Sequence, residues 1–413
     1  MEEFCFVHCA DLHLDSPFSG IGGVSSWLAS RLREATFNAF SRVVDVAVEN
    51  GAAAILIAGD VFDSEYGSLS AQLRFRHIVS RATEAGIAVF VACGNHDPRK
   101  DWMSKVRLPD GVHIFATEPE TRRLVVNGEV VATITGVSFG RRAVRTNLVR
   151  KMRRPQDSPF AVAVLHCNVG GIREHDNYAP CTLEDLRSSR FDYYALGHIH
   201  KPQILSERDP CVVYSGTTQG RAVDETGERG CFLVRVRSGE VLLQFVPTSS
   251  VVWQKKSVAI DGLETVDDLL ERLQDVFDDL RKDNGGVLLH LVLEGSGALN
   301  DMLRREEDRE DILEQLREWE EGRDDFVWTA RLDVKTRGLL DTDGLAQRQD
   351  FVGDFVRAAM RLKDDPQKVK DLLLEGLAQR ELRQIVEQMG QDGLREVVEA
   401  ALELGLSHLL SEG

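Results

Sequence analysis

The sequence lacks the cysteine spacing on which disulfide frameworks and structural zinc sites depend. Its 413 residues include seven cysteines, an odd number, and no two of them form a C-x-x-C pair. This pattern excludes a small disulfide scaffold and a zinc ribbon. We expect the cysteines to be small buried side chains in a reducing compartment, with Cys9 and Cys167 as the two that could instead approach a site.

Long hydrophobic runs are absent as well. No stretch reaches the ~20 apolar residues that a membrane span needs. The first residues, MEEFCFVHCADLHL, have neither the basic start nor the sustained apolar core of a secretory signal. With 43% hydrophobic and 28% charged residues, the composition is that of an ordinary globular protein. We expect a cytoplasmic protein of two or three domains, without a membrane partner.

Basic residues are outnumbered by acidic ones, 50 against 67, so the formal net charge is -17. The deficit is not uniform: residues 1–250 hold 28 Lys and Arg against 29 Asp and Glu, whereas residues 251–413 hold 22 against 38. The N-terminal part can therefore still present a basic surface to nucleic acid. Its segment RRAVRTNLVRKMRRP, residues 141–155, has seven basic residues and no acidic one. Such a run is either a solvated helix face or loop, or a grip for phosphates.

Residues 1–250 alternate apolar, strand-like runs with amphipathic stretches. FCFVHCADLHL, AAAILIAGDVFD and IAVFVACGNHD read as strands, and residues 25–51 and 68–86 between them show helical spacing closed by glycine. This order implies a parallel sheet with helices packed on it. After residue 105 the apolar runs become more frequent, which predicts a second sheet packed face to face on the first.

The remaining residues follow a different rhythm. Residues 251–340 alternate three strand-like and two helical patterns, which predicts a small α+β domain. Residues 341–413 read as helical, with apolar stripes in VGDFVRAAM, VKDLLLEGLAQRELRQIVEQM and LREVVEAALELGLSHLL. These stripes either close an intramolecular bundle or offer a docking surface for a partner helix.

Polar side chains follow the apolar strands at five places. Because ligands of α/β sheets gather at strand ends, we expect these groups to form one site. His, Asp and Asn together suit Mn²⁺, Fe²⁺ or Zn²⁺ in an enzyme rather than a structural site. In D-x-H and H-x-H, strand alternation points both side chains to one face. The five groups are Asp11-Leu12-His13, Gly59-Asp60, Gly94-Asn95-His96-Asp97, Leu165-His166 and Gly197-His198-Ile199-His200.

These motifs, D-x-H, GD-x-x-D, GNHD, a later H and G-H-x-H, resemble those of the calcineurin-like metallophosphoesterases. Within that superfamily, LHCNVGG, HDNYAP, YALGHIHKPQIL, YSGTTQGR and ETGERGC resemble the bacterial DNA repair exonucleases of the SbcD and YhaO type. The resemblance covers residues 1–250. It implies an α/β fold of two packed mixed sheets flanked by helices, an αββα sandwich. The patterns after residue 250 add a small α+β capping domain (251–340) and a helical C-terminal region (341–413).

The resemblance also implies a site for two divalent metal ions, Mn²⁺ above all, with Fe²⁺ or Zn²⁺ as alternatives. One ion would be held by Asp11, His13, Asp60 and His200, and the other by Asp60, Asn95, His166 and His198. His96 would stabilise developing charge or protonate the leaving oxygen, and Asp63 would orient it by a hydrogen bond. At Asp63 the sequence departs from archaeal and eukaryotic relatives, which resemble GD-x-x-H.

The substrate that the resemblance implies is DNA. We expect a Mn²⁺-dependent phosphodiester hydrolase, an exonuclease and also a single-strand endonuclease in DNA repair. The alternative is a phosphodiesterase or phosphatase for small nucleotides or phosphoproteins, since the same metals serve both. The expected protein partners are an SbcC-like coiled-coil ATPase and a second copy of the chain.

Five basic or titratable side chains are predicted to contact the substrate: His175, Arg221, Arg141, Arg142 and Arg145. The alternative prediction for Arg221 is an ion pair with an acid such as Glu225.

Overall fold

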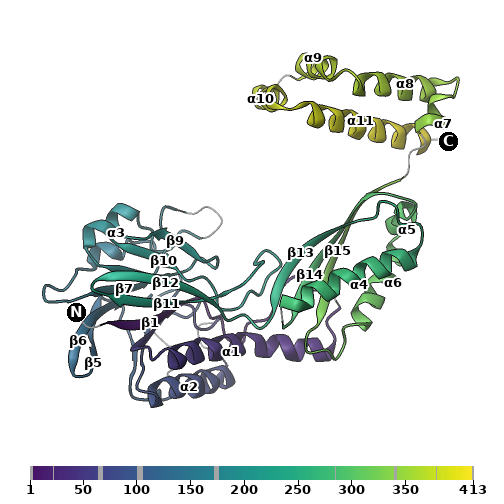
Figure 1. The fold of residues 1–413 in the computed structure, drawn as a ribbon. Coiled ribbons are helices and arrows are strands. Elements are labelled where there is room, and N and C mark those ends of the chain that lie inside the picture. Colours follow the sequence, from purple (N-terminus) through teal and green to yellow (C-terminus); the bar gives the residue numbers. More distant parts are fainter. Residues whose placement is uncertain are drawn as a thin grey trace. The chain divides into compact units, whose positions relative to one another are not determined.

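The computed structural model describes residues 3–21, 23–63, 68–99, 106–171, 176–283, 285–338, 342–377 and 379–411. The chain forms two compact units, which we describe separately (Figure 1). The first comprises Met1–Gly295 and Met302–Lys335, and the second comprises Ser296–Asp301 and Thr336–Gly413. The domain boundaries at 250 and 340 stay predictions.

The first sheet is built from the apolar runs near the N-terminus, joined by two strands from much later in the chain. Its order is β12-β11-β1-β2-β3-β4, parallel from β1 to β4 and antiparallel from β1 to β12. Helices α1 (Ser26–Glu49) and α2 (Leu69–Glu84) form the crossovers, each capped by a serine. The strands are β1 (Phe4–Cys9), β2 (Ala54–Ala58), β3 (Ala88–Ala92), β4 (Val112–Ile114), β11 (Gly230–Arg237) and β12 (Glu240–Pro247).

The second sheet has the order β5-β6-β7-β8-β10-β9 and is also mixed. Its central strands β6, β7, β8 and β10 are parallel, and the edge strands β5 and β9 are antiparallel. Helix α3 (Leu183–Ser189) and a 3-10 turn at Val149–Lys151 accompany it. The strands are β5 (Glu120–Val126), β6 (Glu129–Val137), β7 (Ala161–His166), β8 (Tyr193–Gly197), β9 (Gln203–Ser206) and β10 (Cys211–Tyr214).

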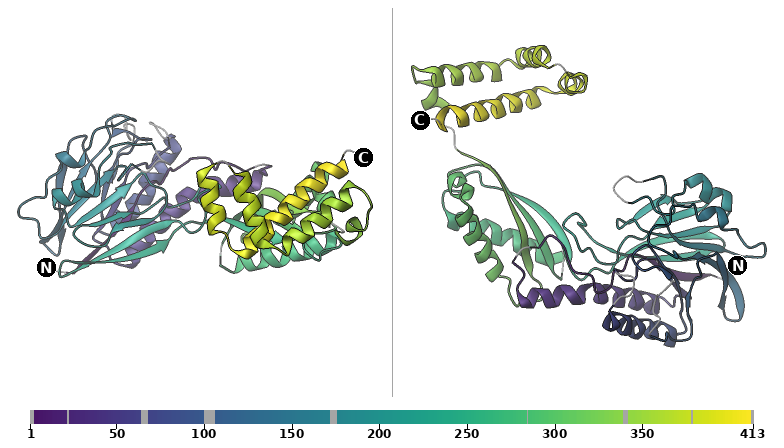
Figure 2. Two further views of the ribbon diagram at one scale, coloured as in Figure 1. Left: turned by 90° about the horizontal axis from the view of Figure 1, so that it is seen from above. Right: turned by 180° about the vertical axis from the view of Figure 1, so that it is seen from behind.

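The two sheets lie face to face between layers of helices (Figure 2). Alternation along β1 makes this arrangement: Val7 packs toward the helices with Phe40, whereas Phe6 packs toward the second sheet with Phe160. Residues of α3 and of the 3-10 turn cover the outer face of the second sheet. The predicted αββα sandwich is confirmed.

A third sheet completes the first unit. Strands β13 (Val252–Ala259), β14 (Val287–Ser296) and β15 (Val327–Arg337) lie in sequence order, accompanied by α4 (Val266–Asp283), α5 (Asn300–Arg304) and α6 (Glu306–Glu318) (Figure 1). The first turns of α1 pack on this sheet, because Leu28 and Leu32 share an apolar cluster with Trp253 and Trp328. Helix α1 thus belongs to the cores of both the first and the third sheet.

The second unit is helical. Its elements are α7 (Thr342–Ala346), α8 (Phe351–Lys363), α9 (Pro366–Gly376), α10 (Arg380–Gln388) and α11 (Gln391–Ser411). The apolar stripes of α8, α9 and α11 share one core, which includes Val356, Val369 and Leu402. The stripes therefore close an intramolecular bundle. Some apolar side chains remain outside this core, and Ile385 is 56% exposed.

All seven cysteines are free and buried, as expected. Within the described residues, no helix is both long enough and apolar enough to cross a membrane.

Candidate metal centre

The predicted ligands all lie at or just after the carboxyl ends of strands from two different sheets. Asp11 and His13 follow β1, Asp60 follows β2 and Asn95 follows β3 in the first sheet. In the second sheet, His166 ends β7, and His198 and His200 follow β8. The backbone N–H of His198 donates to the carboxylate of Asp11 at 3.1 Å, which joins the two edges.

The first cluster contains Asp11, His13 and His200, whose ligand atoms lie within 4.8 Å of one another. The Nε2 atoms of His13 and His200 are 3.2 Å apart. Behind them, Nδ1 of His13 lies 3.0 Å from Oδ1 of Asp63, and Nδ1 of His200 lies 2.5 Å from Oε1 of Glu225. Since a carboxylate only accepts hydrogen bonds, both rings carry a proton on Nδ1. A carboxylate behind a histidine is the arrangement that orients metal-binding imidazoles.

This geometry fits a divalent cation. Two Nε2 lone pairs at this distance repel each other unless a proton or a cation lies between them. The buried carboxylates of Asp11 and Asp60 add negative charge beside the rings. Burial raises the pKa of Asp11 and lowers the pKa of His13 to about 3, and a bound cation favours the carboxylate and the neutral imidazole together. The donor set suits Mn²⁺, Fe²⁺ or Zn²⁺.

The second cluster centres on His166. Its Nε2 lies 2.9 Å from Oδ1 of Asn95 and 3.4 Å from Oδ2 of Asp60, while its Nδ1 donates to the carbonyl oxygen of Ala58 at 3.0 Å. The ring of His198 lies beside it, with centroids 5.1 Å apart. Asp60, Asn95 and His166 are therefore brought together, with Asp60 near both clusters. Nε2 of His198 instead donates to the carbonyl oxygen of Asp176 at 2.7 Å, so this ring would have to give up that hydrogen bond to bind an ion through Nε2.

Four of the seven predicted ligands have a left-handed backbone. Their φ angles are 51° at Asp11, 43° at His13, 50° at Asp60 and 102° at His198. Each such residue costs of order 1 kcal/mol or more and persists only where surrounding contacts hold it. Here the N–H groups of Asp11 and His13 donate to the carbonyls of Gly59 and Asp60, each at 3.0 Å. Strain concentrated at one cluster of polar side chains indicates a functional site.

Two glycines allow the loops to approach one another. A Cβ at Gly94 would lie 2.1 Å from Oδ1 of Asp60, and one at Gly59 would lie 2.3 Å from Nδ1 of His166. Gly59 also has a φ of +104°. Any side chain at either position would displace a predicted metal ligand.

Asp97 is a buried residue to which sequence reasoning gave no role. Its carboxylate accepts hydrogen bonds from the N–H groups of Gly94 (3.0 Å), Val61 (2.8 Å) and Phe62 (3.2 Å). It therefore ties the loop after β2 to the loop after β3, which carry Asp60 and Asn95. Its position in the GNHD motif, directly after Asn95 and His96, was the sequence signal that could have indicated a role at the site.

His96 lies at the open side of the clusters, where its side chain is 42% exposed. Its Nδ1 is 3.1 Å from Oδ1 of Asp63, the same atom that His13 contacts. The hydrogen bond with Asp63 raises the pKa of His96 to about 9 despite the opposing effect of burial. Cations bound at Asp60 and Asn95 would lower this pKa by repulsion.

Arg221 is placed beside the first cluster. Its guanidinium donates to Oγ of Ser16 and lies 4.0 Å from Oδ2 of Asp63. Its backbone N–H, rather than its guanidinium, donates to Glu225, at 2.6 Å. The acid beside the Arg221 guanidinium is therefore Asp63, and not Glu225, the acid named from the sequence.

The predicted substrate contacts of the basic segment are exposed. Arg141, Arg142 and Arg145 precede the 3-10 turn, and the charge of Arg145 is felt by Tyr178, whose ring lies 5.8 Å from that of His198. The later residues of the segment form ion pairs with nearby acids: Arg150 with Asp185, Lys151 with Glu118 and Arg154 with Asp192. His175 lies outside the described residues.

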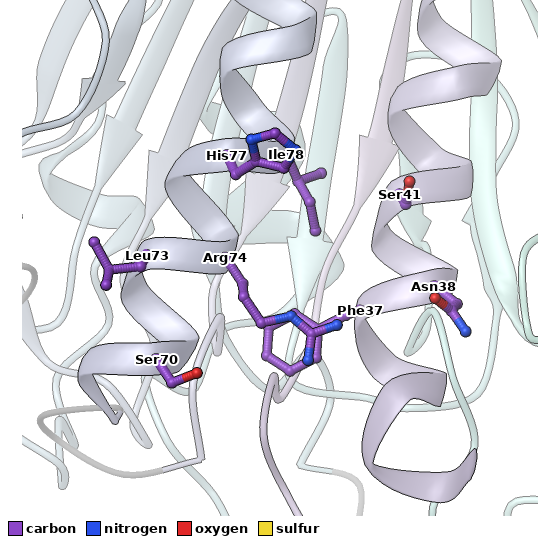
Figure 3. Close-up of a pocket in the computed structure, with 8 residues that line it drawn as sticks. All are labelled: Phe37, Asn38, Ser41, Ser70, Leu73, Arg74, His77 and Ile78. Atoms are coloured by element: carbon purple, nitrogen blue, oxygen red, sulfur yellow. The ribbon is translucent and has the colours of Figure 1, made fainter. Parts of the chain in front are cut away.

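A surface groove of 370 Å³ lies away from these clusters, between α1 and α2 (Figure 3). Its basic side chain, Arg74, lies 3.7 Å above the ring of Phe37 and pairs with Glu34. Because that charge is already matched, the groove offers less to an anionic ligand than the strand-end clusters do.

Comparisons with known proteins agree with this geometry. A family model described as calcineurin-like phosphoesterase matches residues 5–202, and one described as metallophosphoesterase YhaO, middle domain, matches residues 253–337. Over 403 residues the chain is 35% identical to the uncharacterized metallophosphoesterase YhaO of Bacillus subtilis, covering 97% of each chain.

More distant relatives carry names from DNA metabolism. The DNA double-strand break repair protein Mre11 of Saccharolobus solfataricus is 22% identical over 73% of this chain and 77% of its own length. The SbcD subunit of the nuclease SbcCD of Bacillus subtilis is 25% identical over 65% of this chain and 76% of its own length. The chain therefore belongs to the calcineurin-like metallophosphoesterase family, whose members are metal-dependent phosphoester hydrolases.

Proposed function

We propose that this chain hydrolyses phosphodiester bonds of DNA at a centre of two divalent cations, as an exonuclease and single-strand endonuclease in DNA repair. The observation that carries the chemistry is the facing pair of His13 and His200 beside two buried carboxylates. Support for DNA as the substrate comes from the relatives named as a DNA repair protein and a nuclease. Mn²⁺ is the proposed ion, and Fe²⁺ and Zn²⁺ are the alternatives, since all three suit mixed imidazole and carboxylate ligands.

The chain's own residues divide the work. Asp11, His13, Asp60 and His200 would hold one ion, and Asp60, Asn95, His166 and His198 the other. Two bound cations would neutralise the phosphate and lower the pKa of an attacking water. Asp97 and the backbone hydrogen bonds from Asp11 and His13 keep the ligand loops in place before any ion binds, so little reorganisation is needed during turnover.

His96 is the proposed catalytic side chain. It is half-exposed and adjacent to Asn95, so a phosphate held at the ions would lie within reach of its ring. Asp63 accepts the hydrogen bond from Nδ1, which points Nε2 away from Asp63. Nε2–H can then donate to a phosphate oxygen or to the leaving oxygen.

The proposed substrate grip uses the exposed arginines that precede the 3-10 turn. The hydrogen bond to Asp176 raises the pKa of Tyr178, and the charge of Arg145 opposes this rise. The ring of Tyr178 lies 5.8 Å from that of His198. Exposed guanidinium groups of this kind would bind the phosphate backbone of DNA and position it on the protein. Arg221, beside Asp63, is the proposed contact nearer the centre.

We also propose that the helical unit binds a coiled-coil ATPase partner, and that two copies of the chain associate. Support for the first proposal comes from apolar side chains outside the bundle core, such as Leu372 (49% exposed) and Ile385. The relative named as one subunit of the nuclease SbcCD also suggests an assembly. Removing residues 345–413 tests this proposal, because the deleted chain should stay folded and lose the partner.

The direct test is hydrolysis by wild type, Asp60→Ala and Asp157→Ala. Asp157 is exposed and serves as the matched control. End-labelled linear duplex, a single-stranded oligonucleotide and bis(p-nitrophenyl) phosphate are incubated with Mn²⁺ or with chelator. We expect Mn²⁺-dependent cleavage of all three, abolished in Asp60→Ala and kept in Asp157→Ala. Cleavage of the ester without cleavage of DNA would reject DNA as the substrate of the free chain.

A further inference from the structure

Glu225 is a buried carboxylate that stands behind one side of the first cluster. Its side chain is 11% exposed, and Oε1 lies 2.5 Å from Nδ1 of His200. Its other oxygen, Oε2, accepts from the backbone N–H groups of Arg221 at 2.6 Å and Ala222 at 3.3 Å. One carboxylate thus joins the imidazole of His200 to the backbone of the following loop.

These contacts decide which nitrogen of His200 can bind an ion. Because the carboxylate of Glu225 has no proton to give, Nδ1 of His200 carries the proton, and Nε2 keeps its lone pair facing His13. A carboxamide in the same place would turn its oxygen toward the two backbone N–H groups. Its NH₂ would then donate to Nδ1 and move the ring proton to Nε2, where it blocks metal binding.

The loop that carries Glu225 is anchored to β13 of the third sheet. Thr226 forms a β-bridge with Trp253, and the N–H of Gly227 donates to the carbonyl of Trp253 at 2.9 Å. The buried side chain of Gln219 donates to the carbonyl of Val251 at 2.6 Å and accepts from the N–H of Ser250 at 2.9 Å. One end of the loop is therefore held by β13, and the other by the two residues that precede β13, Ser250 and Val251.

His13 is supported differently. Its orienting carboxylate, Asp63, follows β2 and contacts Ser16 and His96, all within the two-sheet core. The rings of His13 and His200, whose Nε2 atoms are 3.2 Å apart, are thus oriented by carboxylates from different loops of the first unit.

We propose that Glu225 is a positioning residue for His200. We also propose that the segment 250–253, which leads into β13, fixes Glu225 through the loop 219–227 and so sets the affinity of the first metal position. This inference rests on the two-metal centre proposed above. It assigns to the third sheet a role in building the centre, in addition to any contact with substrate.

The test measures Mn²⁺ binding to chelator-treated protein, following the electron paramagnetic resonance signal of the free ion. We expect wild type to bind two ions and Glu225→Gln to bind one of them about 10- to 100-fold more weakly, the usual effect of losing such a partner. Glu225→Asp, which keeps an acceptor behind the ring, should lose less. Glu228→Gln is the matched control, since Glu228 is an exposed glutamate of the same loop region.

A spectroscopic readout separates positioning from general damage. In long-range ¹H–¹⁵N spectra of the chelator-treated protein, Nδ1 of His200 should carry a proton in wild type and none in Glu225→Gln. Wild type that binds fewer than two ions would overturn the two-metal centre and this inference with it. Two ions bound by wild type and by Glu225→Gln with equal affinity would overturn the inference alone, as would an equal loss of both ions in the variant.

The role of the segment 250–253 has its own variant. Gln219→Met keeps the volume of the side chain but removes its bonds to Ser250 and Val251. We expect the same ion to bind about fivefold more weakly, the effect of one net hydrogen bond. Unchanged binding in Gln219→Met would remove the segment 250–253 from the inference.

Discussion

His96 and Asp63 form a hydrogen-bonded pair at the open side of the metal centre, with Nδ1 and Oδ1 3.1 Å apart. The same oxygen lies 3.0 Å from Nδ1 of His13, a predicted metal ligand. Asp63 therefore serves two rings with different tasks, and substitutions at His96 and Asp63 should have separable effects.

Replacing His96 with asparagine should spare the metals and remove the proton donor. We expect Mn²⁺ stoichiometry and affinity to stay unchanged and turnover to fall by about 100- to 10,000-fold, the range of a lost general acid. Metal titration and the rate of phosphodiester hydrolysis on the same preparation check this. Turnover equal to that of wild type would exclude His96 as the catalytic side chain.

Replacing Asp63 with asparagine should affect both rings. An amide oxygen in the place of Oδ1 can still accept from both rings but carries no charge, so His13 loses the charge-assisted hydrogen bond that orients it. We expect about 10- to 100-fold weaker binding of one Mn²⁺, together with slower hydrolysis at saturating metal. Normal metal affinity in this variant would contradict the assignment of Asp63 to His13.

Gly94→Ala should disturb the centre without touching a ligand directly. The new methyl carbon would lie 2.1 Å from Oδ1 of Asp60, so the Asp60 side chain or the loop must move. A displacement of order 1 Å at a reacting centre costs about 100-fold in turnover. Gly376→Ala is the control, because an added Cβ there meets nothing within 4 Å. Equal rates in the two variants would mean that the loops adjust freely.

The ligands could be predicted from the sequence because each belongs to a local signal. A strand ends in D-x-H, GD, GNHD or G-H-x-H, and the pleat fixes which side chains point together. The layered fold followed from the same runs. The pairing of β11 with β1, and of β12 with β11, could not be predicted from these runs. Pairing between strands more than 200 residues apart, such as β1 and β11, leaves no local pattern in the sequence.

The supporting residues were harder to find for the same reason. Glu225 lies 25 positions after His200 in the chain, and only the fold brings its carboxylate to Nδ1. Nothing in the helical spacing of α1 indicates that its first turns pack on the third sheet with Trp253. Long-range partners of this kind depend on tertiary contacts rather than on spacing.

Metal binding should stabilise the first unit measurably. An ion at 100 times its dissociation constant contributes about 2.7 kcal/mol, because it binds the folded state alone. For a unit of this size we expect Mn²⁺ to raise the melting temperature of chelator-treated protein by about 5 °C. Asp60→Ala, which lacks the carboxylate near both clusters, should show no such rise. Calorimetry with and without Mn²⁺ gives the comparison, and equal shifts in both proteins would place the bound ions elsewhere.

The exposed arginines before the 3-10 turn should grip DNA in a salt-dependent way. Each phosphate contact contributes about 0.9 to the slope of log affinity against log salt on duplex DNA. Replacing Arg141, Arg142 and Arg145 with alanine should therefore flatten this slope by about 2 to 3 if each contacts a phosphate. Lys151→Ala is the control, because Lys151 is paired with Glu118 at 2.9 Å. Binding is measured with chelator present, so that cleavage does not interfere. An unchanged slope in the triple variant would assign the segment to solvent, the other reading of its charge, and would leave Arg221 as the nearest basic contact for the substrate.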